Sequence, residues 1–277
     1  MPPSRNSGDE GTRMHRWVWA GLAVLGISAP ASAAEFGARA DFWQGELSGD
    51  VKAESGTIPA TKLSFSNLGM DTSESIPSGE VFVRLGKTQA HRLSLRYFEQ
   101  SYRGETTLTQ TVTFKTFTFA ASTSLLSRLA MRDIDFRYAG DVWQGKREPD
   151  ALRRPNAFWG ILGIKTLDLR AELFSTAVGS AEESAVAPLP VVGLGGRWGL
   201  GKRFSLEAEA AGLAMDISDI RATFYEASAS ARWDFSPSVS LEGGWRTWYL
   251  GATIDSTTKV DLSATIQGPF VGLEGRF

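Results

Sequence analysis

Apolar and polar side chains alternate at every second position along most of this chain. That period is expected of an extended strand, whose successive side chains point to opposite faces. At the C-terminal end, Val271, Leu273 and Phe277 share one face, and the charged Glu274 and Arg276 share the other. Such a strand requires an apolar environment on one side and a polar one on the other. A soluble sandwich and a transmembrane barrel both provide these two environments, so this strand alone does not distinguish the two folds. The pattern of the other segments is needed to distinguish them.

The same two-sided pattern recurs in about ten segments, with eight or twelve as alternatives because pattern alone defines segment ends poorly. The segments cover residues 36–47, 81–85, 93–97, 129–138, 158–173, 192–198, 204–210, 225–235, 239–249 and 259–277. An even number of strands returns the chain to the rim where it entered the barrel. The Thr-rich run 107–114 either prolongs the third strand or forms a hairpin on the connection that follows.

The predicted connections are of two kinds. Tight turns are predicted at 86–89, 199–202 and 236–238, and they alternate with longer connections at 49–77, 103–126 and 174–187. Short turns on one rim and long loops on the other are typical of bacterial outer-membrane barrels. One connection, 145–156, is long for the rim that carries the tight turns.

The N-terminal segment has the three parts of a secretory signal peptide. Basic residues, among them Arg13 and Arg16, precede an apolar run at 17–27, and Ala31-Ser32-Ala33 follows as a small-residue cleavage site. The apolar run is shorter than the ~20 residues that a transmembrane helix needs. We therefore predict that residues 1–33 are a signal peptide, with Met14 as an alternative start, and that residues 34–277 form the exported domain.

With this export signal, the alternating strands and the terminal Gly-Leu-Glu-Gly-Arg-Phe, the chain resembles small single-chain outer-membrane β-barrel proteins of Gram-negative bacteria, the OmpA/OmpW-like class. The resemblance implies an all-β, transmembrane antiparallel up-and-down β-barrel in the cell outer membrane, in contact with lipid and lipopolysaccharide. It also implies that Val271, Leu273 and Phe277 form the C-terminal signal read by the outer-membrane barrel assembly machinery.

Composition is compatible with this class and excludes several others. The hydrophobic fraction of 42% suits a barrel, because only every second residue of a strand faces lipid. The absence of Cys excludes disulfides, thiolate nucleophiles and Cys-ligated metals. Residues 34–277 hold 26 basic and 29 acidic residues, a net charge of −3, which argues against a nucleic-acid partner.

We expect the apolar faces of the strands to meet lipid and the charged faces to point into the lumen. In the fifth segment, for example, this assigns Leu167 and Leu173 to lipid and Asp168 and Arg170 to the interior. The expected lumen charge network comprises Glu207, Glu209, Glu226, Arg232, Asp234, Glu242, Arg246, Glu274 and Arg276. A barrel of ~8 to 10 strands is narrow enough for such side chains to fill much of it. We predict a plugged lumen, with a narrow polar channel as the alternative.

Aromatic residues near the strand ends suit the girdles that barrels place at the two membrane interfaces. The candidates are Trp43, Trp198, Trp233, Phe235, Trp245 and Tyr249.

Enzymatic chemistry has little support in the sequence. Proton transfer near neutral pH usually relies on histidine, and only His91 remains after residues 1–33 are removed. Ser94 lies three positions further on, so the two side chains face opposite sides of one strand. Asp133 and Asp135 share a face, but neighbouring arginines favour ion pairing. We therefore predict no enzymatic activity, and the sequence contains no cofactor or metal motif.

Three functions follow from these observations. The first is a non-enzymatic outer-membrane barrel with a structural or surface-interaction role. The second is a narrow channel or transporter that passes small solutes. The third is a lipid-modifying outer-membrane enzyme. The near absence of histidine from residues 34–277 argues against this third function.

Overall fold

The computed structural model describes residues 34–277 except 56–59, 115, 149, 218–219 and 256–257. The predicted signal peptide, residues 1–33, lies outside the described residues. No helix in the described part of the chain is long and apolar enough to cross a membrane.

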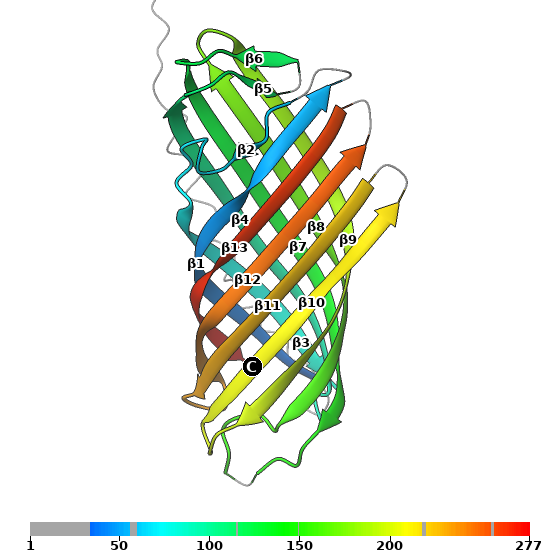
Figure 1. The fold of residues 1–277 in the computed structure, drawn as a ribbon. Helices are drawn as coiled ribbons and strands as arrows, with labels where there is room; N and C mark the ends of the chain where they lie inside the picture. Colours follow the sequence, from blue (N-terminus) through cyan, green and yellow to red (C-terminus); the bar gives the residue numbers. More distant parts are fainter. Residues whose placement is uncertain (1–33, 56–59, 115, 149, 218–219, 256–257) are drawn as a thin grey trace, which may run out of the picture. The chain divides into compact units, whose positions relative to one another are not determined.

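Ten long antiparallel strands form a closed barrel (Figure 1). They are β1 (Ala34–Ser55), β3 (Ser73–Leu85), β4 (His91–Thr107), β7 (Ser124–Gln144), β8 (Ala157–Ser175), β9 (Gly179–Gly199), β10 (Phe204–Ile217), β11 (Ile220–Asp234), β12 (Val239–Asp255) and β13 (Thr258–Arg276). Each long strand pairs with the next, and β13 pairs with β1 to close the barrel. This confirms the predicted transmembrane up-and-down barrel and its ten strands.

Three short strands lie in the two long connections of one rim. The two-residue β2 (Leu63–Ser64) pairs with β1. The strands β5 (Val112–Phe114) and β6 (Phe117–Phe119) form a separate hairpin. The Thr-rich run therefore does not prolong the third strand: β4 ends at Thr107, and the hairpin follows.

The predicted tight turns are present, but one predicted long connection is wrong and another is shorter than predicted. The connection predicted at 174–187 is a turn at 176–178, because β8 and β9 pair as far as Ser175 and Gly179. The connection predicted at 49–77 is shorter, because β1 continues to Ser55 and β3 begins at Ser73. In both places the strands run on after their outward side chains become polar, which is where the sequence pattern appeared to end.

The outer surface carries a band of exposed apolar side chains. Val271 and Leu273 are 51% and 54% exposed, and Phe42 and Phe136 lie on the same outer face. Burying apolar surface contributes about 25 cal/mol per Å², so a continuous band of this kind is costly in water. Lipid around the barrel removes that cost.

Beyond this band, towards the two long connections, the outer surface is charged. Arg132 lies 3.7 Å from Glu99 and 3.7 Å from Asp168, and all three side chains are at least one-third exposed. The wall therefore extends into water on this side. In the same part of the barrel, Leu167 and Leu173 face inward and are buried. The assignment of these leucines to lipid and of Asp168 and Arg170 to the lumen was wrong, because water rather than lipid surrounds this end.

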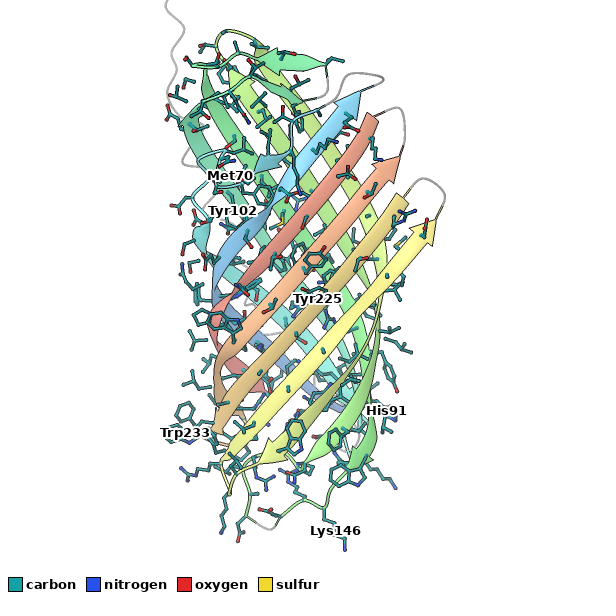
Figure 2. The ribbon with its side chains drawn as sticks, viewed as in Figure 1. Met70, His91, Tyr102, Lys146, Tyr225 and Trp233 are labelled. Carbon is teal, nitrogen blue, oxygen red and sulfur yellow. The ribbon has the colours of Figure 1, made fainter. Side chains whose placement is uncertain are left out.

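Most of the predicted girdle residues lie on the outer face. Trp198, Trp233, Phe235 and Trp245 are exposed there, and Tyr249 stacks on Tyr225 with a centroid distance of 4.8 Å. Figure 2 shows Trp233 and Tyr225 at two levels of the wall.

Trp43 is the exception among the predicted girdle residues. It is 1% exposed and lies inside the barrel, edge-on to Phe98 at 6.4 Å. Its neighbour Phe42 faces out, and successive residues of a strand face opposite sides, so Trp43 must face in.

Candidate functional site

The lumen is divided into a charged half and an apolar half. We call the charged half the polar layer; it contains the nine residues of the predicted network together with Arg39, Asp41, Glu80, Arg92, Arg96, Asp133, Asp135, Arg137, Lys165 and Arg197. We call the apolar half the apolar chamber. It lies towards the two long connections and contains the large buried apolar side chains Leu47, Phe65, Phe114, Leu129, Leu167, Leu173, Phe224, Trp248 and Leu250.

The structure brings each of the nine predicted network residues into the lumen, in ion pairs. Within the set, Arg232 donates to Glu274 at 3.0 Å, and Arg276 donates to Asp234 at 2.6 Å. The other five pair with residues outside the set: Glu207 with Arg197 at 2.7 Å, Glu209 with Arg137 at 3.0 Å, Glu226 with Arg96 at 2.9 Å, Glu242 with Arg39 at 3.1 Å, and Arg246 with Asp41 at 3.1 Å.

The predicted network did not include these five partners. They lie on β1, β4, β7 and β9, and the signal for them is the same alternation, since each occupies an inward position of its strand. The alternation does not say which strands exchange ion pairs inside the lumen. Arg246 and Asp41, for example, are 205 positions apart in sequence.

A buried lysine marks the boundary between the two halves. Lys165 Nζ lies 2.7 Å from Asp133, 3.2 Å from Asp135 and 3.2 Å from Glu226, and its side chain is 0% exposed. The ring of Phe224, on the apolar side, lies 4.8 Å from the same nitrogen. A buried ammonium group is stable only when it is paired and hydrogen-bonded, and three carboxylates provide that here.

The polar layer leaves little free space. It encloses a cavity of about 90 Å³, bordered by charged side chains such as Arg96, Arg197 and Glu242. A cavity of this size and polarity suits a few water molecules, each of which needs two to four polar partners.

At the short-turn rim, the connection 145–156 contacts both the turn between β9 and β10 and strand β1. The backbone N–H groups of Leu152 and Arg153 donate to the carbonyl of Lys202, and Arg154 pairs with Glu35 on β1. Burial lowers the pKa of Arg154 to about 10, and the Glu35 carboxylate opposes that shift, so this guanidinium remains charged at neutral pH. The length of this connection, unexpected for its rim, thus reflects contacts across the mouth of the barrel.

The apolar chamber contains a cavity of about 430 Å³. Leu129, Leu167, Leu173, Leu189 and Leu250 line it, and most of the other lining side chains are apolar. The polar lining residues are Arg128, Glu172, Glu183 and Ser184. Pockets for small molecules typically measure ~300 to 1,000 Å³ and are mainly apolar. The chamber therefore has the size and chemistry of a ligand site, which the sequence analysis did not predict.

The two long connections cover the open end of the apolar chamber. In the connection between β1 and β3, Phe65 and Leu68 are buried, and Met70 forms a β-bridge with Gly104. Figure 2 shows Met70 and Tyr102 in this part of the barrel. In the second connection, Phe114 and other apolar side chains of the β5–β6 hairpin are also buried.

The candidate catalytic residues are dispersed. His91 lies on the outer face at the short-turn rim, where its Nδ1 is 2.7 Å from the Tyr138 hydroxyl oxygen. Ser94 borders the small polar cavity inside the barrel. Asp133 and Asp135 belong to the Lys165 cluster. In the described residues, no group of three or more His, Cys, Asp or Glu side chains is arranged to hold a metal ion.

The predicted C-terminal signal lies along the closure of the barrel. Val271, Leu273 and Phe277 point outward, and Phe277 is 70% exposed. The backbone of Phe277 exchanges two hydrogen bonds with Phe36 on β1, at 2.9 and 3.0 Å. The terminal residue therefore contributes to the β13–β1 pairing.

Comparison with known proteins shows likeness in structure only. No protein-family model matches the sequence, and no curated protein matches it significantly. Among solved structures, the outer membrane protease OmpT from Escherichia coli matches with 13% identity and a TM-score of 0.48, over 87% of this chain and 97% of that one. The transport unit of the autotransporter AIDA-I from Escherichia coli matches with 8% identity and a TM-score of 0.43, over 93% and 94%.

Neisserial surface protein A (NspA) is a third match, with 13% identity and a TM-score of 0.35, over 87% of this chain and 97% of that one. At these identities and TM-scores, the matches carry no argument about the activity of this chain.

Proposed function

We propose that this outer-membrane barrel binds an apolar small molecule in the apolar chamber and does not conduct ions or hydrated solutes. The observation that carries the proposal is the division of the lumen. A cavity of about 430 Å³ with an apolar lining lies beside a layer of buried ion pairs. A surface-interaction role of the two long connections is compatible with this proposal, since they cover the chamber.

The polar layer supports a closed lumen. Its arginines and carboxylates pair between strands inside the lumen, and its cavity measures about 90 Å³. Buried ion pairs with good geometry are costly to break, because removal of one partner leaves an uncompensated charge. A hydrated ion would have to disrupt several of these pairs in order to pass.

We also propose that the protein is not an enzyme. His91 lies outside the lumen, at the rim opposite the apolar chamber, and its ring contacts Tyr138. The chamber itself is lined mainly by leucine, alanine, valine and proline side chains, and its polar lining residues, Arg128, Glu172, Glu183 and Ser184, include no histidine to transfer protons near neutral pH.

Photolabelling of the refolded protein in detergent micelles tests ligand binding. The probe is palmitic acid with a diazirine at the end of its chain, and peptide mass spectrometry locates the adducts. We expect saturable adducts on inward residues such as Leu173, Leu189 and Leu250. Adducts confined to the outer apolar band would contradict the proposal.

Planar-bilayer recording tests the closed lumen. We expect no stable open-channel conductance from the purified, refolded protein. Stable channels would instead support the alternative of a narrow solute channel.

A further inference from the structure

The barrel wall has a seam between β9 and β10. The ladder between these strands runs from Ser205 and Gly199 to Gly212 and Val192, and there it ends. Both strands continue beyond this point, β9 back to Gly179 and β10 on to Ile217, and on their other sides they remain paired with β8 and β11. Figure 1 shows β10 leaning away from β9 above their common lower part.

Two prolines on β9 account for the end of the ladder. Pro190 and Pro188 lie two and four positions before Val192, the last residue of β9 that pairs with β10. Proline has no N–H to donate, and alternate residues of a strand bond towards the same side, so two prolines two positions apart weaken one edge of β9. The ladder between β9 and β8 continues past both prolines, so the weakened edge is the one that faces β10.

The seam opens into the apolar chamber. Leu189 and Pro190 on one side of the seam and Met215 on the other line its cavity of about 430 Å³. By contrast, the gap between the ends of β3 and β4 is occupied by the connection before β3, where Asp71 donates to the carbonyl of Arg103 and Met70 bridges to Gly104. Among the described residues, by contrast, no connection forms a backbone hydrogen bond or β-bridge with β9 or β10 where these two strands separate beside the chamber.

The outer edges of the seam lie at the boundary of the lipid-facing band. On β9, Val192 and Val186 are exposed on the outer face, Val186 to 66%. The next outward positions towards the start of β9 are the polar Ser184 and Glu182. On β10, exposed Ala214 is followed by Asp216, and the interfacial Tyr225 lies opposite Gly212. Because long connections of such barrels are extracellular, this boundary belongs to the outer leaflet.

We infer that the seam is a lateral entrance through which one acyl chain of an outer-leaflet amphiphile inserts into the apolar chamber. This inference rests on the proposed ligand-binding function and adds its ligand class and route. The other approaches are obstructed by the polar layer on one side and by the two long connections on the other. An acyl chain fits because it can leave the lipid phase without crossing water, while its polar head stays at the charged outer surface beside the seam.

Cross-linking of the seam tests the route, and the absence of native cysteine makes this straightforward. Continuation of the register would place Pro190 opposite Ala214, both exposed on the outer face. The P190C/A214C variant, reacted with a bis-maleimide that spans the seam, closes it. The control variant L194C/A210C carries the same cross-link four residues away, between two outward residues that are already paired.

Each variant is reconstituted in phosphatidylcholine vesicles with one of two probes, a phosphatidylcholine or a palmitic acid whose chain ends in a diazirine. We expect inward adducts on Leu173 and Leu250 in the wild type and in the cross-linked control, and a severalfold loss of these adducts in cross-linked P190C/A214C. Unreacted P190C/A214C should label like the wild type, which excludes a folding defect. Labelling by the phospholipid probe would identify a membrane lipid as the source, and labelling by the acid alone would identify a single-chain amphiphile.

Equal inward labelling of both cross-linked variants would overturn the lateral entrance and leave ligand binding intact. Absence of inward labelling in the wild type, with either probe and in micelles as well, would overturn the proposed function itself.

Discussion

The two halves of the lumen are enclosed by the same ten strands but are filled in opposite ways. The polar layer uses charged side chains that pair between strands, as in the contacts of Lys165 and Arg232 with carboxylates from other strands. The apolar chamber is surrounded by leucines and aromatic residues and keeps a cavity of about 430 Å³.

The difference reflects what surrounds each half. Around the polar layer the outer wall faces lipid, so the apolar side chains are needed outside and the charged ones are placed inside. Around the apolar chamber the wall extends into water, so the charged side chains lie outside and the apolar ones inside. An alternating strand satisfies both environments by changing which face is apolar, as β8 does between Ile164, which faces out, and Leu167, which faces in.

The largest expected effect concerns the closure that both halves share. Deletion of Phe277 removes the two backbone hydrogen bonds with Phe36 and the proposed terminal assembly signal. We expect a severalfold loss of protein assembled in the outer membrane, measured by heat-modifiable gel migration of membrane fractions. His91→Ala, at an outward rim position, is the control and should assemble normally. Similar assembly of the two variants would argue against a role of the terminal residue.

The next prediction concerns the polar layer. Lys165→Met leaves three buried carboxylates with one cation fewer, and removal of one partner from a buried ion pair typically costs about 3 to 5 kcal/mol. Urea unfolding in micelles should show a loss of this size. Arg132→Met removes a cation that is about half exposed on the outer wall, and should cost about 1 kcal/mol or less. If both changes cost the same, the polar layer does not stabilise the barrel in the way described here.

In the apolar chamber, we expect ligand binding and stability to depend on keeping the lining apolar. Leu250→Asn introduces an unpaired amide into the cavity lining, at a cost of about 1 to 3 kcal/mol, and should lower photolabelling by the palmitic acid probe. Leu250→Met, which conserves volume, should cost less than about 1.5 kcal/mol and keep the labelling. Undiminished labelling of the Asn variant would place the ligand elsewhere.

The smallest effect is expected at the short-turn rim. Combined Arg153→Ala and Arg154→Ala substitution weakens the closure by the connection 145–156. Both arginines are buried, but the carboxylates that lose a partner, Glu148 and Glu35, are 56% and 20% exposed, so we expect a cost of about 1 kcal/mol for each ion pair lost. Planar bilayers should still show no stable channels, because the polar layer remains. Lys146→Ala with Arg147→Ala, both exposed in the same connection, is the matched control. Channels that open only in the first variant would assign closure to the rim rather than to the polar layer.

Much of the fold could be predicted because the alternation is local. The ten strands and the inward positions of Glu226 and Arg232 follow from the period of two together with lipid on one side. The assignment of Leu167 and Leu173 to lipid was wrong for the same reason. A local pattern shows that the two faces of a strand differ, but it does not show whether lipid or water lies outside that part of the wall.

By itself, the sequence determined the class of fold and the set of charged residues available for the lumen, because both depend on side-chain spacing along single strands. Only the tertiary structure decided which charges pair, as in Arg246 with Asp41, where barrel closure joins distant strands. The tertiary structure also determined that the apolar chamber exists and that the seam lies beside Pro188 and Pro190. These depend on how far the wall rises above the lipid and on where two neighbouring strands separate, and no single strand carries that information.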